Sequence, residues 1–364
     1  MNIALLSCNT GGGHNAAASA LAQELSHRGL HSRTYDALDF LPKNAAELIS
    51  RGHDFAYRYT PKLYGVGYRK EEKRPSPLLY DNSIRGIGPL HEALLQDNID
   101  AVICVHLFPA MMMTELRCNY GLRLPCWFVA TDFTCSPGVG SLRLDGICIP
   151  HPALAEEFEV AGAGRIYATG IPVRQEFCAP PDRAGARAAL GLSDRERVLT
   201  LACGSMGAGP LRATAADIAE LLGENDTLVT VCGSNQRLFE QLRDDFVNEP
   251  RVRVLGFTRQ MCQYMQASDL LISKAGGLTT AEAVASGTPL LYLDAVPGCE
   301  SRNLQFMTSR GFALGVEEGE SIAPLLRGFF SGSIDVTAML RRRAGSFPVD
   351  ASSAICDLLC NTTA

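Results

Sequence analysis

Several features that would point to particular protein classes are missing from this 364-residue sequence. It holds no run of about 18 uncharged apolar residues, so we expect no membrane-spanning helix. Its start, Met-Asn-Ile-Ala-Leu-Leu, lacks the basic segment and cleavage site of a secretory signal peptide and is typical of a first strand. These absences favour a cytoplasmic protein.

Basic charge and paired cysteines are also scarce. The formal net charge of −6 argues against a nucleic-acid partner, because binding to a phosphate backbone requires a basic surface. The thirteen cysteines form no C-x-x-C pair, and several, such as Cys104, Cys203 and Cys232, lie in apolar runs. We expect them to be small core residues or free thiols rather than disulfides, zinc ligands or redox groups.

Short β-rich apolar runs alternate with helical patterns along most of the chain. This alternation is typical of βαβ units and parallel sheets. The length suits two domains, since a single core seldom grows beyond about 250 to 300 residues. The expected strands fall into two series, at 3–7, 101–105, 126–130, 147–150 and 165–169, and at 198–203, 228–232, 252–255, 270–273 and 290–293.

A proline-rich stretch separates the two series. Pro172, Pro180 and Pro181 precede a new helical pattern that begins at Asp182. We therefore predict an N-terminal domain over 1–174 and a C-terminal domain over 175–344. A last helix over 345–364 is expected to pack back onto the first domain.

Each half begins with a strand followed by a glycine-rich turn and a helix. The turns are Gly11-Gly12-Gly13-His14 and Gly204-Ser205-Met206-Gly207-Ala208-Gly209. Such turns bring backbone N–H groups close to an anion, so a phosphate or an oxyanion would fit there. Neither turn matches an ATPase loop or a dinucleotide fingerprint, and packing alone accounts equally well for each glycine run.

The stretch KAGGLTTAEAVASGTPLLYLDAVPGCESRN, residues 274–303, combines more features. Gly276-Gly277 open a helix in which Glu282 lies among apolar residues, where a carboxylate needs a partner. A ribose diol would serve, although a salt bridge or an exposed position is the alternative. A second helix start at Pro297-Gly298-Cys299-Glu300 could hold a diphosphate with its amides.

At these residues the chain resembles a known family. The segment is similar to the nucleotide-sugar-binding part of monogalactosyldiacylglycerol synthases and bacterial diacylglycerol glucosyltransferases, relatives of the glycosyltransferase that completes the peptidoglycan lipid precursor. Further resemblances follow in order from residue 5 to about 305: TGGGHNAAASAL, HLFPA, ATDFTCSP and ATGIPVRQEF.

The resemblance implies an α/β fold of the GT-B type, two Rossmann-like lobes with parallel sheets facing a central cleft. The first lobe would bind the acceptor and the second a UDP-sugar. By resemblance, Glu282 would bind the uridine ribose, and Glu300 and Asn303 the phosphate or the hexose. The donor-binding residues expected in full are Gly204, Ser205, Met206, Gly276, Gly277, Thr279, Glu282, Pro297, Gly298, Glu300 and Asn303; those on the acceptor side are Gly11, Gly12, Gly13, His106, Thr131, Asp132 and Phe133.

His14 is the expected catalytic residue. An imidazole with a pKa near 6.5 suits a general base that takes a proton from an acceptor hydroxyl, while a histidine that only caps the glycine turn is the alternative. The chain departs from the family nearby, with Asn9 in place of the usual Asp, Asn15 in place of an Arg that often follows the His, and Ser136 in place of the usual His. These changes lie on the acceptor side and leave the acceptor less defined than the donor.

We accordingly predict an inverting hexosyltransferase that uses a UDP-sugar and a lipid hydroxyl, foremost that of diacylglycerol. No Asp-x-Asp triplet occurs, so neither a metal nor another cofactor is expected. An isoprenoid-linked or small-molecule acceptor, or a catalytically weak UDP-sugar-binding protein, are the alternatives.

Residues 51–74 carry seven Lys or Arg against three acids, interleaved with tyrosines. Such a segment suits an anionic membrane surface, so a peripheral position on the inner face of the cell membrane is expected; a surface loop with buried tyrosines would look similar.

Overall fold

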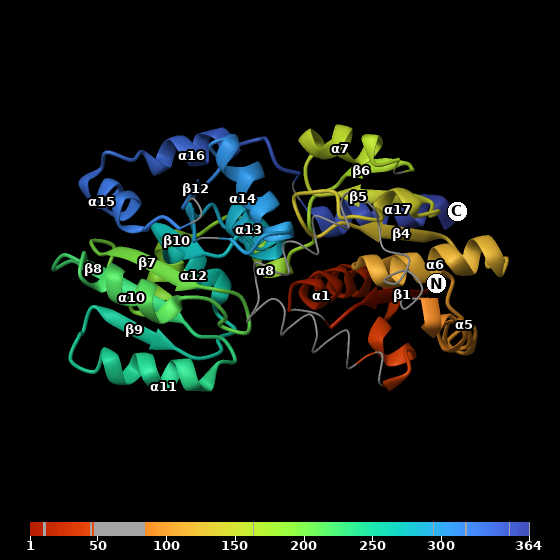
Figure 1. Ribbon diagram of the computed structural model, residues 1–364, viewed down its shortest axis with the longest axis horizontal. Coiled ribbons are helices and arrows are strands. Elements are labelled where there is room, and N and C mark those ends of the chain that lie inside the picture. Colours follow the sequence, from red (N-terminus) through yellow and green to blue (C-terminus); the bar gives the residue numbers. More distant parts are fainter. Residues whose placement is uncertain are drawn as a thin grey trace. The chain divides into compact units, whose positions relative to one another are not determined.

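The computed structural model describes residues 1–9, 12–43, 46, 84–162, 164–293, 295–316, 319–348 and 350–363. The chain forms two compact units (Figure 1). The first comprises Met1–Gln175, Val296–Arg302 and Pro348–Ala364, and the second Glu176–Ala295 and Asn303–Phe347. The basic segment 51–74 and Gly11 lie outside the described residues, so the interpretation of 51–74 as a membrane surface stays a prediction.

Each unit is built on a sheet of six parallel strands. In the first unit the strand order is β2-β1-β3-β4-β5-β6, and in the second it is β12-β11-β10-β7-β8-β9. The first sheet holds β1 (Asn2–Ser7), β2 (His31–Asp36), β3 (Ala101–Cys104), β4 (Cys126–Val129), β5 (Gly146–Ile149) and β6 (Ile166–Ala168). The second holds β7 (Arg197–Ala202), β8 (Asp226–Val231), β9 (Val252–Leu255), β10 (Leu270–Ser273), β11 (Leu290–Tyr292) and β12 (Leu314–Gly315).

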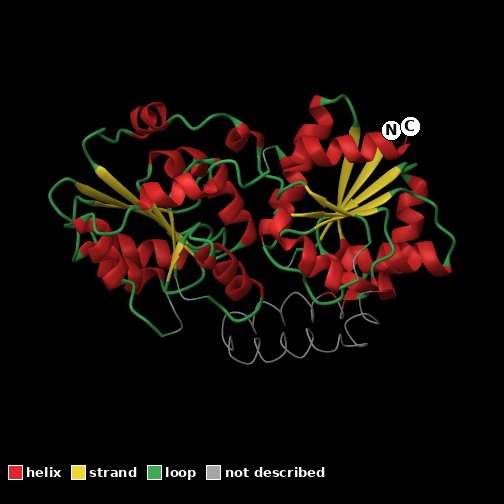
Figure 2. Cartoon of the chain, turned by 90° about the horizontal axis from the view of Figure 1, so that it is seen from above, coloured by secondary structure: helices red, strands yellow, loops and turns green. Residues whose placement is uncertain are grey.

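Helices cover both faces of each sheet (Figure 2). Those of the first unit are α1 (Gly12–His27), α5 (Ile87–Gln96), α6 (Leu107–Asn119), α7 (Ala155–Val160) and α17 (Ala351–Thr363), with 3-10 turns η1 (Ala37–Phe40), η2 (Ile84–Gly86), η3 (Val139–Ser141) and η4 (Pro152–Leu154). Those of the second are α9 (Arg183–Leu190), α10 (Leu211–Ala219), α11 (Gln236–Asp245), α12 (Met261–Ala267), α13 (Gly277–Ala285), α15 (Ala323–Ser331) and α16 (Val336–Arg343). Helices α8 (Gln175–Cys178) and α14 (Cys299–Ser309) contain residues of both units.

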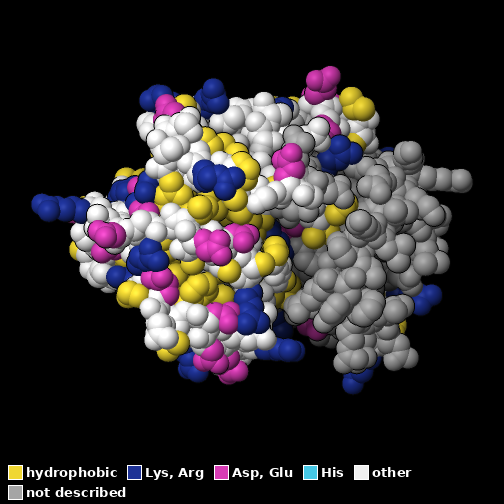
Figure 3. Space-filling model, turned by 60° about the vertical axis from the view of Figure 1, so that its left-hand side comes forward, with side chains coloured by type: hydrophobic (Ala, Val, Ile, Leu, Met, Phe, Trp, Pro, Cys, Tyr) yellow, Lys and Arg dark blue, Asp and Glu magenta, His cyan; other side chains and the backbone are white. Residues whose placement is uncertain are grey.

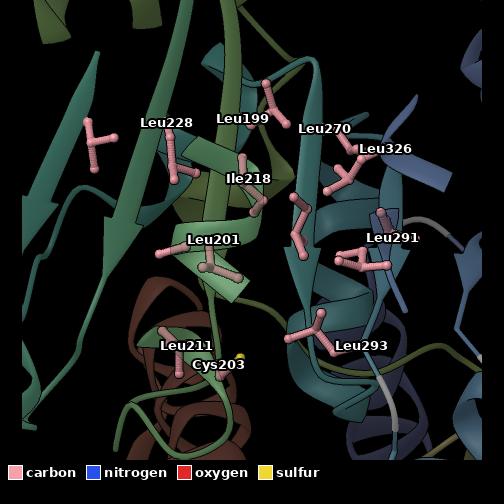
Figure 4. Close-up of a cluster of buried hydrophobic side chains, with 14 of the residues drawn as sticks. Leu199, Leu201, Cys203, Leu211, Ile218, Leu228, Leu270, Leu291, Leu293 and Leu326 are labelled. Carbon is pink, nitrogen blue, oxygen red and sulfur yellow. The ribbon is translucent and has the colours of Figure 1, made fainter. Parts of the chain in front are cut away.

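Burial on both faces explains why the central strands are continuous apolar runs. In the second unit, leucines from neighbouring strands meet residues of α10 and α15 in one cluster (Figure 4). Strand residues Leu199, Leu201 and Leu270 and helix residues Ile218 and Leu326 are among its members. The predicted α/β class with two parallel sheets is confirmed.

The surface and the cysteines agree with the composition. On the described part of the face in Figure 3, Lys and Arg side chains lie interspersed with Asp and Glu. The thirteen cysteines are free thiols. Within the described ranges, every helix is too short or too polar to cross a bilayer.

Helix α17 packs onto α1, although the two lie at opposite ends of the sequence. Leu359 of α17 is buried in the same cluster as Leu21 and Leu25 of α1 and Trp127 of β4. At the edge of this contact Arg28 donates to Asp357 at 2.6 Å and to the hydroxyl of Ser353 at 2.6 Å. The C-terminal helix therefore completes the core of the first unit.

This contact predicts a local loss of stability. Leu359→Ala should lower the free energy of unfolding of the first unit by about 2 to 5 kcal/mol, because it leaves a cavity in a packed core. Trp127 is the single tryptophan and is buried in the first unit, so its fluorescence during urea denaturation reports that unit. Leu95→Ala, at a side chain 61% exposed, is the control. An unchanged midpoint for Leu359→Ala would contradict this account of α17.

Candidate functional site

The strand order of each sheet reverses once, and the expected site residues gather there. In the first unit the chain leaves β1 for β2 on one side and later returns to β3 on the other. In open α/β sheets, ligands bind at the carboxyl ends of the strands beside such a reversal. His14 follows β1, His106 follows β3, and Thr131 and Asp132 follow β4, the next strand in the sheet.

The His14 ring is held from two of these strand ends. Its Nδ1 lies 2.9 Å from the carbonyl oxygen of Val105 and 3.0 Å from Oγ1 of Thr131. A carbonyl oxygen can only accept, so Nδ1 carries the proton and donates it. In the neutral ring Nε2 then has the lone pair, which is the tautomer that a general base requires. His14 is thus held by a hydrogen bond to Val105, the residue that follows β3.

The surroundings also set the charge of His14. Burial lowers the pKa of the imidazole below its usual 6.5, while the negative charge of Asp132 and the hydrogen bond to Val105 act in the opposite direction. Because the lowering dominates, the ring is neutral at pH 7. A neutral imidazole with Nε2 unprotonated can accept a proton without first losing one.

His106 has a different part in this arrangement. Its Nδ1 accepts from the backbone N–H of Phe108 at 3.1 Å and so caps α6. Its ring meets that of His14 edge to face, with the centroids 4.6 Å apart. Phe133 is a core residue at 2% exposure, whereas Asp132 is partly exposed. Gly12 and Gly13 lie in the first turn of α1.

A polar chain links the end of β1 to α1. Ser7 donates to Oδ1 of Asn15 at 2.6 Å, and Nδ2 of Asn15 donates to Oδ1 of Asn9 at 3.3 Å. The backbone N–H of Asn9 donates to Asp36 at the end of β2. Asn9 and Asn15, two of the three residues that depart from the family, therefore bond to each other. Ser7 and Val105 were not expected at the site, and a backbone carbonyl such as that of Val105 gives no sequence signal.

The second glycine turn, between β7 and α10, is shaped largely by packing. Gly204, Gly207 and Gly209 have φ values of +70°, +55° and +122°. A Cβ on Gly207 would lie 2.0 Å from the carbonyl oxygen of Cys232, and the N–H of Ser234 bonds the carbonyl of Ser205 at 2.8 Å. Ser205 is exposed and Met206 is half-buried. Here the chain itself requires glycine.

The turn before α13 differs in this respect. Gly276 has an ordinary φ of −73°, and a Cβ there would meet nothing nearer than Oγ1 of Thr279 at 4.0 Å. As the N-cap residue it offers no side-chain cap to the helix. Lys274, which precedes this turn, approaches the β7 turn, with its Cδ 3.6 Å from where Gly209 would carry a Cβ. The two turns thus meet beside the strand reversal at β7 and β10.

Glu282 is buried on α13, with 7% of its surface exposed. The structure therefore excludes the alternative that this carboxylate lies on an exposed face. The half-buried Thr279 lies in the first turn of the same helix, next to Gly277. Glu282 thus lies buried in the helix that begins at the glycine turn.

The loop before α14 is internally bonded. The N–H of Gly298 donates to Oγ of Ser301 at 3.0 Å, and the N–H of Val296 approaches Oε2 of Glu300 at 3.4 Å. Pro297 and Glu300 are half-buried. Asn303 is fully buried, and its Nδ2 donates to the carbonyl of Ala275 at 2.8 Å. The amide of Asn303 thus contacts the backbone just before α13.

Each unit therefore gathers its own set of expected residues. The first brings His14, His106, Thr131 and Asp132 to one sheet edge, and the second brings the β7 turn and the start of α13 together. Among the residues that the structure describes, no group of three His, Cys, Asp or Glu side chains could hold a metal ion.

Comparisons with known families agree with the two units. Residues 14–173 match the model of the family described as monogalactosyldiacylglycerol (MGDG) synthase, and residues 198–306 match the glycosyltransferase family 28 C-terminal domain. The processive diacylglycerol beta-glucosyltransferase of Bacillus pumilus is 26% identical over 88% of this chain and 84% of its own. That of Bacillus subtilis is 25% identical over the same shares.

Solved structures show the same fold at low identity. MurG of Acinetobacter baumannii aligns with a TM-score of 0.65 at 15% identity, over 99% of both chains. HepE of Anabaena in complex with UDP-glucose aligns with a TM-score of 0.55 at 15% identity, over 99% of this chain and all of the other. The predicted GT-B fold class is confirmed.

The contacts of His14 predict its titration. Its pKa should lie below 6.5, and Asp132→Asn should lower it further, because removing the negative charge removes stabilisation of the imidazolium. Two-dimensional NMR of ¹⁵N-labelled histidines would give both the pKa and the tautomer, with Nδ1 protonated in the neutral ring. A pKa above 6.5, or a neutral ring protonated on Nε2, would contradict this description.

Proposed function

We propose, from the premise that the chain belongs to the glycosyltransferases of the monogalactosyldiacylglycerol synthase type, that it transfers a hexose from a UDP-sugar to the hydroxyl of diacylglycerol. The single observation that carries the proposal is the position of His14 at the strand reversal of the first unit, where the carbonyl of Val105 holds Nδ1 and leaves Nε2 to serve as proton acceptor. The diacylglycerol acceptor is supported by the activity for which the two Bacillus relatives are named.

The proposed reaction is one displacement at the anomeric carbon. Nε2 of His14 takes the proton of the acceptor hydroxyl as its oxygen forms the bond to the anomeric carbon. The bond from that carbon to the diphosphate oxygen breaks, the electron pair leaves with UDP, and the configuration inverts. Since no covalent sugar–enzyme intermediate forms, no side-chain nucleophile is needed.

The second unit would hold the donor. Amides at the start of α13 suit the diphosphate, because a helix N-terminus favours an anion and Gly276 leaves room for close approach. As UDP departs, these amides would stabilise the charge that develops on the leaving oxygen. Glu282 would accept from the ribose hydroxyls, as the family resemblance implies. We propose that the reaction needs no metal or other cofactor.

We further propose that the enzyme works in the cytoplasm on the inner face of the cell membrane. Diacylglycerol stays in the bilayer, so the enzyme has to reach a membrane surface. Residues 51–74 supply cations for anionic headgroups and tyrosines for the interface.

A transfer assay tests the proposal directly. The protein is incubated with vesicles of diacylglycerol and an anionic lipid, with UDP-glucose, UDP-galactose or UDP-N-acetylglucosamine in turn, and products are detected by mass spectrometry. A glycolipid from one donor, formed equally in EDTA, is the expected result. Transfer only to an isoprenoid-linked or small-molecule acceptor would overturn the lipid assignment, and UDP-sugar binding without any transfer would favour a binding protein.

Removing the base should affect the chemical step. His14→Ala should lower kcat by roughly 10²- to 10⁴-fold and leave UDP affinity nearly unchanged, since the ring would act on the acceptor proton. His31→Ala, at an exposed histidine of β2, is the matched control. Turnover that survives in His14→Ala would show that the histidine is structural.

Removing the ribose carboxylate should affect binding. Glu282→Ala should weaken UDP binding by about 1.5 to 3 kcal/mol, the usual cost of losing hydrogen bonds to a charged group. Isothermal titration calorimetry measures the change, with Glu240→Ala on the exposed face of α11 as control. Unchanged affinity in Glu282→Ala would remove the ribose assignment.

A further inference from the structure

Three buried side chains hold the two peptide carbonyls that lead into α13. Nδ2 of Asn303 donates to the carbonyl of Ala275 at 2.8 Å, and Oγ1 of Thr280 donates to that of Gly276 at 2.8 Å. The phenol oxygen of Tyr292 lies 2.7 Å from Oγ1 of Thr280. Thr280, Tyr292 and Asn303 are each 0% exposed.

The direction of these bonds follows from the proton count. A threonine hydroxyl has one proton, and Thr280 gives it to Gly276, so the hydroxyl of Tyr292 must donate to Thr280. Burial raises the pKa of Tyr292 well above its usual value, which keeps the phenol protonated. The result is a relay of two hydrogen bonds from Tyr292 through Thr280 to Gly276.

The three side chains come from different elements. Tyr292 ends β11, the strand beside β10, while Asn303 belongs to α14 and Thr280 to α13 itself. The turn between β10 and α13 is therefore braced from its neighbouring strand and from the following helix. The carbonyl of Gly276 accepts from both the N–H of Thr280 at 2.9 Å and the hydroxyl of Thr280 at 2.8 Å, so this peptide is held at two points.

When the carbonyl group of a peptide is held in place, the N–H group of the same peptide is held as well, because the peptide is planar. Within the described residues all peptide bonds are trans, so the C=O of Gly276 and the N–H of Gly277 point in opposite directions. The carbonyl of Gly276 points into the helix toward Thr280, and the N–H of Gly277 therefore points out of the helix start. A rotation of this peptide would turn the amide away and bring the carbonyl oxygen toward the anion.

We infer that Tyr292 and Thr280 are positioning residues that aim the N–H of Gly277, at the start of α13, at the diphosphate of the UDP-sugar. Asn303 fixes the preceding peptide, whose N–H on Gly276 donates to the carbonyl of Lys274 at 2.9 Å. This inference rests on the proposed function, since it presumes that the start of α13 holds that diphosphate. It assigns Asn303 to the backbone of Ala275, whereas the family resemblance implies a direct contact with phosphate or hexose.

Comparison of UDP with uridine separates this role from a purely structural one. The two ligands share the ribose and differ in the diphosphate, so misaimed amides should weaken UDP and leave uridine unaffected. Thr280→Val and Tyr292→Phe remove one hydroxyl each and keep the shape of the side chain. Calorimetry gives the UDP affinity, ligand-observed NMR gives that of uridine, and thermal unfolding checks folding.

The expected loss is about 3- to 10-fold in UDP affinity for each variant, the net effect of one hydrogen bond, with the uridine affinity unchanged. The double variant should be little worse than Thr280→Val, because both hydroxyls act through one relay. Matched controls are Thr308→Val, whose hydroxyl bonds the carbonyl of Leu304 on α14 in the same way, and Tyr35→Phe, whose hydroxyl bonds Asp97 in the first unit. The controls should leave both affinities unchanged.

The outcomes separate this inference from the proposed function. A wild-type protein that does not bind UDP would overturn both. Binding of UDP by the wild type, with equal weakening of UDP and uridine in the variants or no weakening of either, would overturn the positioning role alone. If Thr280→Val fails to fold, Tyr292→Phe decides, because it removes a single atom from the more distant end of the relay.

Discussion

The reversal of strand order in each sheet is the constraint on which the candidate residues of each unit depend. Parallel strands end at one edge of a sheet, and only beside a reversal do two neighbouring loops lead in opposite directions and leave room for a ligand. In the first unit this places α1 next to the end of β3, so Val105 can hold His14. In the second it brings the turn after β10 to the turn after β7.

Hydrogen bonds to backbone carbonyls fix the geometry of the candidate residues at these sheet edges. The tautomer of His14 follows from one carbonyl oxygen, and the start of α13 is shaped by bonds to the carbonyls of Ala275 and Gly276. A backbone acceptor cannot titrate, so the carbonyl of Val105 favours the same neutral tautomer of His14 at every pH. The charge of His14 is then governed by burial, with Asp132 as the main opposing influence.

Much of this could be predicted from the sequence, for a physical reason. Strands buried on both faces are apolar runs, and a glycine run after a strand marks a close approach of backbone, so the two sheets and their turns leave clear patterns. The alanines around Glu282 predicted its burial. The contact between Asn303 and Ala275 could not be predicted, since the two residues lie 28 positions apart and a backbone carbonyl is the same in every residue.

Gly207 and Gly276 look alike in the sequence but differ in whether the fold requires a glycine. Gly207 is required by its neighbours, because a side chain would collide with the carbonyl of Cys232, whereas a Cβ on Gly276 would meet no atom of the described residues nearer than Oγ1 of Thr279 at 4.0 Å. A residue that costs conformational entropy without easing a collision in the fold has to be explained by something outside the chain. In the proposed donor site, a diphosphate close to the helix start would supply that explanation. It would also account for the bonds between the neighbouring carbonyls and buried side chains, because these bonds would keep the turn from rotating the amide of Gly277 away from the anion.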